Sequence, residues 1–398
     1  MKGWKEDELG RVANYAKEKI DAKSLDASTY VSTENMLPDI CGIVPSSYLP
    51  KDGKVLGFEN GDVLVSNIRP YFKKIWRAKY AGGCSNDILV FRSDVSKILP
   101  EFLYYQLAQN DFFDFMMAGA NGVKMPRGNR DLIPKFKFKL PPLPTQKKIA
   151  RILSAYDDLI ENNLRRIKLL EEMAQITYEE WFVHLRFPGH TTTPINPTTG
   201  LPDGWKKVRL GDMCHLTMGQ SPKSEFYNTD GNGLPFHQGV KDYGERFPSN
   251  ASWSTEGARY AERGDVLFSV RAPVGRLNIA LEKMILGRGL AAICHKQKAQ
   301  GFLYCLLKKQ FFAEDMMGGG AIFNSVTKND MLRIDVVQPD ENTLQKFNQI
   351  VSASDREIEV LHIQNQRLRE ARDILLPRLM TGVIDAEKYQ PENLLKKN

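Results

Sequence analysis

The chain of 398 residues lacks the signatures of common nucleotide-hydrolysing and DNA-modifying enzymes. It has no G-x-x-x-x-G-K-[ST] phosphate-binding loop, which argues against ATP hydrolysis by this chain. It also has no [N/D]-P-P-[Y/F] motif of a DNA amino-methyltransferase and no E-x-K triplet of a restriction nuclease. The six histidines are scattered without the spacing of metal ligands. We therefore expect no catalytic residues, no metal site and no cofactor of its own.

Long apolar runs and paired cysteines are absent as well. No apolar run approaches the roughly 18 residues of a membrane-spanning helix, and the first residues lack the apolar stretch of a signal peptide. The five cysteines contain no C-x-x-C pair, so neither a disulfide framework nor a structural zinc site is expected. These absences favour a cytoplasmic protein without a membrane partner. The net charge of +7 is compatible with a polyanionic partner, although many proteins of this size carry it.

The chain does contain an internal repeat. The pattern GDVLxSxxxP runs from Gly61 to Pro70 and again from Gly264 to Pro273, an offset of 203 residues. Other landmarks match at offsets between 198 and 201, so the two halves are a duplication, which indicates a partner with two similar parts. Asp62 and the matching aspartate, Asp265, follow a glycine and precede a strand, which is typical of turn formation and not of a catalytic pair.

Each half mixes predicted strands and helices. In the first half, β-rich runs occupy 62–65, 87–91 and 135–139, and the last of them alternates lysine with phenylalanine as a strand with one exposed face should. A helix is expected to begin at Pro100, where proline fits the first turn. The second half repeats this plan from 205 onward. Both units are therefore predicted to be α+β.

A long helix with heptad spacing is predicted after each mixed unit. Apolar positions recur in alternating steps of four and three residues, the period of a coiled coil. The first series comprises Ile149, Leu153, Tyr156, Ile160, Asn163, Ile167, Leu170, Ala174, Thr177 and Trp181. The second comprises Phe347, Val351, Ser354, Ile358, Leu361, Asn365, Leu368, Arg372 and Leu375. Pro377 is expected to end the second helix, because proline removes a helical hydrogen bond.

One asparagine in each series predicts how the helices pair. If they pack antiparallel with Asn163 opposite Asn365, the facing pairs 153 with 375, 160 with 368, 167 with 361, 170 with 358 and 177 with 351 also fall on both series. Two facing asparagines can satisfy each other, whereas a facing leucine would leave one unpaired, so the pair would fix the register. We expect an antiparallel coil about 45 Å long, at 1.5 Å per residue. The alternative is that each helix packs only on its own globular unit.

The predicted fold class is thus α+β, with two similar globular domains joined by an antiparallel coiled coil in a pseudo-two-fold arrangement. The linker between the halves is expected to lack core-forming residues and the tail to be poorly ordered. The predicted boundaries are 1–144 for the first domain, 145–188 for its helix, 189–204 for the linker, 205–339 for the second domain, 340–380 for its helix and 381–398 for the tail.

The combination of motifs resembles the specificity subunit of Type I restriction–modification systems. The resemblance is carried by the GDVLxSxxxP blocks, by the segments 67–75 and 219–224, and by the proline-opened helices that close with Trp181-Phe182 and with 375–380. It implies a non-catalytic DNA-binding subunit in which each target-recognition domain binds half of a split double-stranded target. It also implies helical spacers that set the gap and dock two methyltransferase subunits, with motor–nuclease subunits completing the complex. S-adenosylmethionine and ATP would then belong to these partners.

Residues that contact DNA are expected on polar loops that follow buried strands. The candidates in the first unit are Asn67, Arg69, Tyr71, Lys73, Lys74, Lys124, Arg127, Asn129 and Arg130, and those in the second are Ser221, Lys223, Gln238, Arg271, Arg276, Asn324, Ser325 and Thr327. Among them, Tyr71 is expected to pack and not to stack on a base. Because 67–69 and 270–272 differ in sequence, the two half-targets are expected to differ too.

Two other classes of protein remain open from the sequence. One is a stand-alone DNA-binding or architectural protein, which would not co-purify with methyltransferase subunits. The other is a duplicated enzyme with an unfamiliar site, which would show turnover by the isolated chain.

Overall fold

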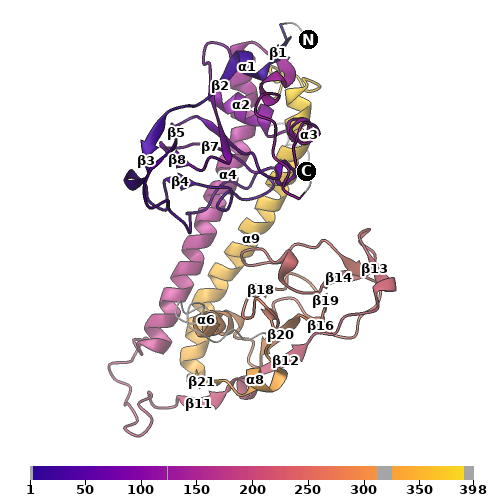
Figure 1. The fold of residues 1–398 in the computed structure, drawn as a ribbon. Coiled ribbons are helices and arrows are strands. Elements are labelled where there is room, and N and C mark those ends of the chain that lie inside the picture. The colour runs from indigo at the N-terminus through magenta and orange to yellow at the C-terminus, as the bar shows by residue number, and fades with distance from the viewer. Residues whose placement is uncertain (1–2, 123, 312–324, 390–398) are drawn as a thin grey trace. The chain divides into compact units, whose positions relative to one another are not determined.

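The computed structural model describes residues 3–122, 124–311 and 325–389. These residues form two compact units, of which unit 1 comprises 1–163 with 363–398 and unit 2 comprises 164–362. Two long helices, α4 (Leu143–Tyr178) and α9 (Glu341–Met380), contribute a stretch to each unit (Figure 1). We describe each unit by itself.

Unit 1 contains three antiparallel or mixed sheets and a few short helices. Its strands are β1 (Lys5–Glu8), β2 (Ala13–Tyr15), β3 (Lys19–Asp21), β4 (Tyr30–Val31), β5 (Lys54–Phe58), β6 (Val63–Ser66), β7 (Ile75–Arg77), β8 (Gly82–Cys84), β9 (Ile88–Ser93) and β10 (Lys137–Leu140). Its helices are α1 (Leu9–Val12), α2 (Pro100–Leu107) and α3 (Asn110–Ala118), with 3-10 turns η1 (Ala22–Ser24), η2 (Pro70–Phe72) and η3 (Ile133–Lys135). The strands predicted at 62–65, 87–91 and 135–139 correspond to β6, β9 and β10, and α2 begins at Pro100 as predicted.

The GDVL strand of unit 1 lies between two hydrophobic cores. The sheet order is β2-β9-β6-β7, and Val63 and Leu64 of β6 face Phe91 and Val90 of β9 in antiparallel register. Val63 packs in a core with the helices, whereas Leu64 packs in a second core against the sheet β3-β5-β8-β4. Since alternate residues point to opposite faces of a strand, all four residues of β6 are buried. This explains the continuous apolar run in the motif.

Unit 2 repeats the same plan. Its strands are β11 (Lys206–Arg209), β12 (Cys214–Met218), β13 (Tyr227–Asn228), β14 (Leu234–His237), β15 (Trp253–Ser254), β16 (Tyr260–Ala261), β17 (Val266–Ser269), β18 (Leu277–Ile279), β19 (Met284–Leu286), β20 (Leu290–His295) and β21 (Asp335–Gln338). Its shorter helices are α5 (Leu210–Met213), α6 (Gln300–Phe311) and α8 (Lys328–Leu332), with the π-turn η4 (Glu179–Val183) and 3-10 turns η5 (Ser224–Phe226) and η6 (Val240–Asp242).

The duplication extends to sheet order and to the division between cores. The sheet β12-β20-β17-β18 corresponds to β2-β9-β6-β7, and the pair β11-β21 corresponds to β1-β10. Within β17, Val266 and Phe268 pack in one core and Leu267 in another, as the matching residues of β6 do. The remaining sheet differs, because unit 2 has the five-stranded order β13-β15-β14-β19-β16 where unit 1 has four strands.

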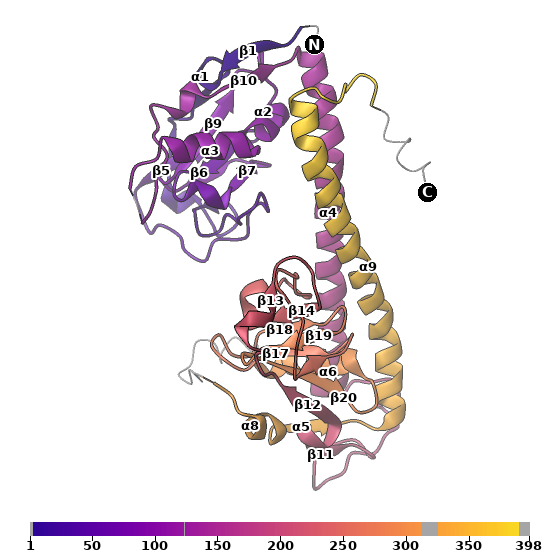
Figure 2. The same ribbon diagram turned by 90° about the vertical axis from the view of Figure 1, so that its right-hand side faces the viewer.

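In unit 1, the stretches of α4 and α9 run antiparallel with the predicted asparagines in contact (Figures 1 and 2). Asn163 Nδ2 donates to Asn365 Oδ1 at 2.9 Å, and both side chains are buried. The two amides are only partly satisfied by this hydrogen bond, because Asn163 Oδ1 and Asn365 Nδ2 have no hydrogen-bond partner. Arg372, also in the predicted series, donates to Asp157 at 2.7 Å. The contact was therefore predicted correctly, while its role in fixing register stays a prediction.

In unit 2, the same two helices pair through Ile167, Ile358 and Leu361, which share a small core with Phe247. The predicted series fails near the end of α4, where Thr177 is only half-buried and its hydroxyl donates to the Met173 carbonyl. Tyr178 is buried in its place. The reason is that α4 here also packs on the main core of unit 2, so the buried face widens beyond a heptad stripe.

Three predictions about chain ends and breaks are wrong. Helix α9 continues through Pro377 to Met380, because the proline removes only its own N–H from the hydrogen-bond ladder, and its carbonyl still accepts from Thr381 N at 3.0 Å. The tail packs against α4 from residue 381 to 389, with Ala386 buried and the Tyr389 hydroxyl 3.3 Å from that of Tyr156, while the predicted tail residues 390–398 lie outside the described residues. The linker does supply a core residue, since Leu201 is buried in unit 2.

Candidate nucleic-acid interface

The two aspartates of the repeated motif form turns. Gly61 and Gly264 have φ angles of 94° and 89°, which favour glycine. Asp62 Oδ2 accepts from the Glu59 amide at 2.8 Å, and Asp265 Oδ2 accepts from the Glu262 amide at 2.9 Å. The first aspartate also binds Arg92 through both carboxylate oxygens. These contacts agree with the turn interpretation, and each turn feeds a buried strand whose far end reaches the candidate loops.

In unit 1, the structure brings together two loops that the sequence offered as separate candidates. The loop after β6 pairs with the glycine-flanked loop around residue 127, through an antiparallel bridge between Ile68 and Arg127. The Arg69 amide donates to the Pro126 carbonyl at 2.8 Å, and the Gly128 amide donates to the Asn67 carbonyl at 3.1 Å. Residues 67–74, 121–122 and 124–130 are therefore one surface, which we call the unit 1 loop pair.

Several side chains of the unit 1 loop pair differ from the expectation. Asn67 is buried, because its backbone continues the sheet edge, so its side chain is not an exposed contact residue. Tyr71 is only half-covered, with 47% of it exposed, because η2 is a single turn between two left-handed residues and stands outside the sheet. Its ring contacts that of Phe72, which is also exposed.

The basic side chains of this loop pair are partly engaged. Lys74 Nζ donates to the Thr33 carbonyl at 2.6 Å, and burial lowers the pKa of its amine. Arg127 lies 3.3 Å from Asp87, and Arg130 donates to the Asn86 carbonyl.

The remaining predicted residues of unit 1 differ in exposure and in whether the side chain takes part in the fold. Lys124 is exposed, whereas Lys73 is half-buried. Arg69 is also half-buried, with a buried Nε that lacks a hydrogen-bond partner. Asn129 has a structural role, since its Oδ1 accepts from the amides of Asp131 and Leu132 and so caps a turn.

Unit 2 has a corresponding loop pair, formed among the described residues by 270–276 after β17 and by 325–327. Arg271 bridges Ser325, and the Val326 amide donates to the Val270 carbonyl at 2.9 Å. Arg271, Arg276 and Ser325 are exposed. Thr327 caps α8 through its hydroxyl, as Asn129 caps a turn in unit 1, so this side chain is engaged in the fold. Asn324 lies outside the described residues.

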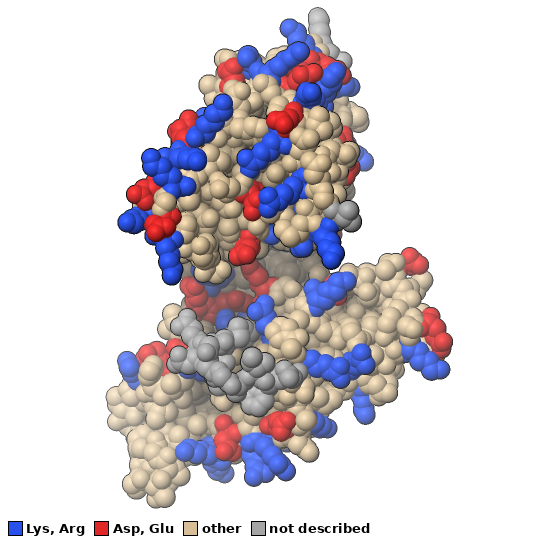
Figure 3. Space-filling model, viewed as in Figure 1, with Lys and Arg blue, Asp and Glu red and all other residues tan. Residues whose placement is uncertain are grey.

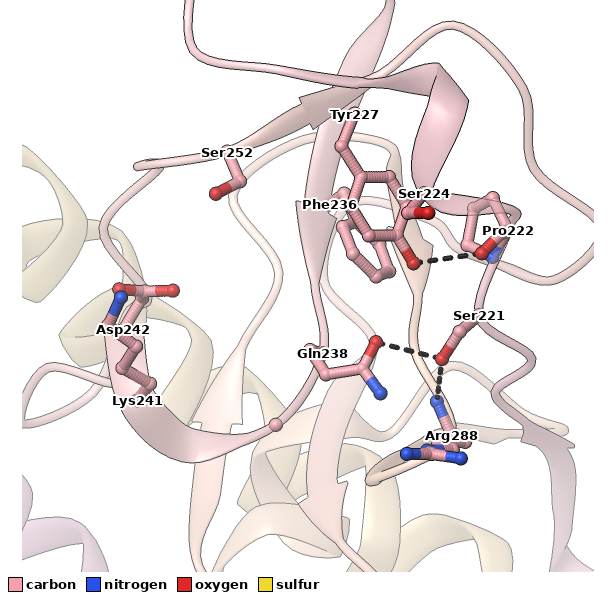
Figure 4. Close-up of a pocket in the computed structure, with 11 residues that line it drawn as sticks. Ser221, Pro222, Ser224, Tyr227, Phe236, Gln238, Lys241, Asp242, Ser252 and Arg288 are labelled. Atoms are coloured by element: carbon pink, nitrogen blue, oxygen red, sulfur yellow. Dashed lines mark hydrogen bonds between the residues drawn. The ribbon is translucent and has the colours of Figure 1, made fainter.

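The remaining candidates of unit 2 border a recess of about 600 Å³ (Figure 4). Ser221 Oγ donates to Gln238 Oε1 at 2.8 Å and accepts from the Arg288 amide at 3.1 Å. Tyr227 and Phe236 form an aromatic wall, with ring centroids 4.6 Å apart. Lys223 is largely exposed and lies 3.7 Å from Glu225, beside the recess.

Arg288, Tyr227 and Phe72 were missed in the sequence. Arg288 stands in a short segment without a polar cluster, whereas Tyr227 and Phe72 lie in polar segments. In all three cases only the fold shows that the side chain lies beside the candidate loops. The one available signal was glycine: Arg288 lies between Gly287 and Gly289, as expected where backbones approach closely.

Charge on these units is distributed and not gathered in one place. On the visible face of each unit, lysine and arginine groups are separated by uncharged surface and by acidic residues (Figure 3). In the described parts of the chain, no cluster of three histidine, cysteine or acidic residues could hold a metal ion. Among the same residues, none of the helices is both long and apolar enough to cross a membrane. All five cysteines are free thiols.

Two α+β domains of one plan, each with polar loops paired beyond a buried strand, define the class of duplicated recognition proteins. Comparison with known proteins places the chain within that class. The family model of the Type I restriction modification DNA specificity domain matches twice, at residues 1–172 and 202–370. The chain therefore belongs to the family of Type I restriction–modification specificity subunits.

Individual relatives agree with this membership. The chain is 31% identical over 305 residues to a putative type I restriction enzyme MjaX specificity subunit of Methanocaldococcus jannaschii, covering 75% of this chain and 71% of the relative. It is 23% identical to the type I restriction enzyme HindI specificity subunit of Haemophilus influenzae, covering 96% and 100% of the two chains. The crystal structure of a Type-I restriction-modification system S subunit from M. genitalium shares the fold, with a TM-score of 0.60 at 16% identity over 95% of this chain and 96% of that one.

The family confirms the coarse predictions. The chain has DNA-recognition domains in a duplicated arrangement, and it is a recognition component and not a catalyst.

Proposed function

We propose that the chain recognises a double-stranded DNA target in two parts, with one half bound by each unit. The observation that carries this proposal is the repeated loop pair: Ile68 bridges Arg127 in unit 1, and Arg271 bridges Ser325 in unit 2. Each loop pair directly follows the corresponding buried strand of its unit, β6 or β17, so each unit offers a recognition surface at an equivalent place. A duplicated surface of this kind suits a target with two half-sites.

Within each loop pair, we assign contacts by chemistry. Exposed cations such as Lys124 and Arg276 suit phosphate oxygens, which position the protein without reading sequence. The exposed aromatic pair Tyr71 and Phe72 offers apolar contact in a groove. We assign contacts with base edges to Arg271, to Ser325 and to the polar groups at the recess of unit 2.

We propose that α4 and α9 form one antiparallel coiled coil that relates the two units by pseudo-two-fold symmetry and sets the distance between half-sites. The support comes from each unit taken alone, because the helices pair antiparallel in both. Helix α4 also carries an apolar stripe in unit 2 that no part of the described chain covers: Leu169, Met173 and Ile176 are 58%, 47% and 62% exposed. Their spacing places them on one helix face.

Such an uncovered stripe suits a helical partner surface. We assign this stripe to the docking of a methyltransferase subunit, of which the complex would contain two. Motor–nuclease subunits would then complete the complex, which would act in the cytoplasm. The boundaries predicted from the sequence separate the domains that would bind DNA from the helices that would dock these partners, and we keep them as part of this proposal.

The experiment is an exchange of residues 205–338 for the equivalent unit of a relative, followed by methylome sequencing of cells that also express the cognate methyltransferase. The methylated motif should change in one half only, and the reciprocal exchange of residues 1–144 should change the other half. A change in both halves, or in neither, would contradict the proposal. The mass of the purified complex checks the partners, since two methyltransferase copies are expected for each copy of this chain.

A further inference from the structure

The recess of unit 2 is built by three chain segments held at unusually close approach. Segments 237–239 and 287–289 are joined by backbone hydrogen bonds from Gly287 N to His237 O at 2.8 Å and from Gly289 N to Gln238 O at 3.1 Å. Segment 219–221 is held beside them, because the Gly219 and Gln220 amides donate to the Leu290 and Leu286 carbonyls, both at 2.9 Å. A Cβ on Gly219 would stand 2.1 Å from the Gly287 carbonyl oxygen, and one on Gly287 would stand 2.5 Å from Gln238 Cα. A side chain larger than that of glycine would clash at these positions, so glycine allows the three segments to approach closely beside the recess.

This recess is continuous with the loop pair of unit 2. The Val270 amide donates to the Gly289 carbonyl at 2.9 Å, and Arg271 of the loop pair follows directly. The Arg288 side chain is exposed beside this junction. Gln238 and Arg288 therefore lie on the surface that the proposed function assigns to DNA.

The hydrogen bonds of the recess orient the Gln238 amide. Because Ser221 Oγ accepts the Arg288 backbone N–H, its own proton is directed to Gln238 Oε1. The amide oxygen thus accepts the Ser221 proton, and Nε2 makes no hydrogen bond to the other residues drawn and remains a donor (Figure 4). Among the described residues, no acidic side chain pairs with the Arg288 guanidinium, which adds further donors beside it.

Donors without acceptors match one base edge in the major groove. Guanine presents two acceptors there, N7 and O6, whereas adenine presents one acceptor and one donor, and the Arg288 guanidinium has no acceptor to receive that donor. The recess does not select a phosphate, because the Asp242 carboxylate borders it beside the Lys241 amine and the two charges offset each other.

We propose that Arg288, aided by Gln238 Nε2, recognises a guanine in the half-site bound by unit 2. This assignment rests on the proposed function, because it requires that unit 2 bind one half of the target. It makes Ser221 a positioning residue, which acts by holding the Gln238 amide in its donor orientation.

The test uses the complete chain in complex with its methyltransferase and duplexes of the methylated motif. Each guanine of the half-site assigned to unit 2 is replaced in turn by 7-deazaguanine, which lacks the N7 acceptor but still pairs with cytosine. At one position, binding should weaken by roughly 5- to 150-fold, the range for loss of a good bidentate contact. The R288A complex should bind the natural and the 7-deaza duplex equally at that position.

The matched control is K223A, which removes an exposed cation beside the recess. It should weaken binding to both duplexes alike and leave the 7-deaza effect intact. A second variant, S221A, should reduce the effect without abolishing it, because only the orientation of Gln238 is released.

The proposal is overturned if no guanine of this half-site is sensitive, or if R288A remains as sensitive as the unmodified chain. These results leave the two-part target standing, whereas a complex that methylates no two-part motif overturns the proposed function itself.

Discussion

Arg246 of unit 2 is the most deeply buried cation in the described ion pairs, and its loss should be the most costly of them. Only 4% of its side chain is exposed, and it lies 3.2 Å from Glu171 on α4. It also contacts Asp355 on α9 and stands over the Tyr304 ring, with its guanidinium carbon 4.3 Å from the centroid. One side chain thus ties the globular part of unit 2 to both of its helices.

The substitution R246M keeps the length of the side chain but leaves two carboxylates without their cation. Removing one partner of a buried ion pair costs about 3–5 kcal/mol, and the lost cation–π contact adds to this. The matched control is R263M, which breaks a pair with Glu359 on α9, where 62% of the arginine side chain is exposed. An exposed pair of this kind contributes less than about 1 kcal/mol.

Hydrogen exchange measured by mass spectrometry in urea provides the assay, because it reports the unfolding free energy of residues 164–362 separately from that of unit 1. We expect R246M to destabilise only unit 2. Burial already raises the pKa of Asp355, and loss of Arg246 should raise that pKa further. A carboxyl whose pKa is raised in the folded state favours folding at low pH, so the deficit of R246M should shrink as the pH falls. Equal costs for R246M and R263M would refute the reasoning.

Two further predictions concern the helix pair and acid stability. The single variant N163L should destabilise unit 1 by about 1–3 kcal/mol, because it leaves the Asn365 amide buried and unpaired. The double variant N163L/N365L should exceed the stability of the unmodified chain in urea, and a double variant weaker than the single one would contradict this. His295 is buried, which lowers its pKa from 6.5 to about 4. The unfolded state therefore takes up the proton first, and the stability of unit 2 should fall by up to about 3 kcal/mol between pH 6.5 and 4. H295Q should remove most of this pH dependence, and an unchanged profile would exclude His295 as its source.

Features governed by local periodicity could be predicted from the sequence. The strand Val63–Ser66 was predicted because it is apolar throughout, and the helix from Pro100 because proline fits a first turn. The pairing of Asn163 with Asn365 followed from heptad spacing alone. In each case the evidence lies within one segment or in a regular relation between two.

Features that depend on tertiary packing could not be predicted in this way. Thr177 falls on the heptad series, yet Tyr178 is buried, because α4 contacts a second set of core residues there. Asn67 has the residue type of a base-contacting loop, but its backbone pairs with Asp87 and Gly128, which buries the side chain. Arg288 had no polar neighbours in sequence, and close glycine contacts brought it to the recess.

Equivalent backbone positions in the two units hold side chains of different charge, and this difference is the physical reason to expect unlike half-sites. The Asn67 amide donates to the Asp87 carbonyl in unit 1, and the Val270 amide donates to the Gly289 carbonyl in unit 2, so Asp87 and Gly289 occupy equivalent positions. In unit 1 this position supplies a carboxylate that pairs with Arg127. In unit 2 it supplies no side chain, and the preceding Arg288 is exposed. Since the strands that hold both positions are buried alike, recognition can change at these loop residues without disturbing either core.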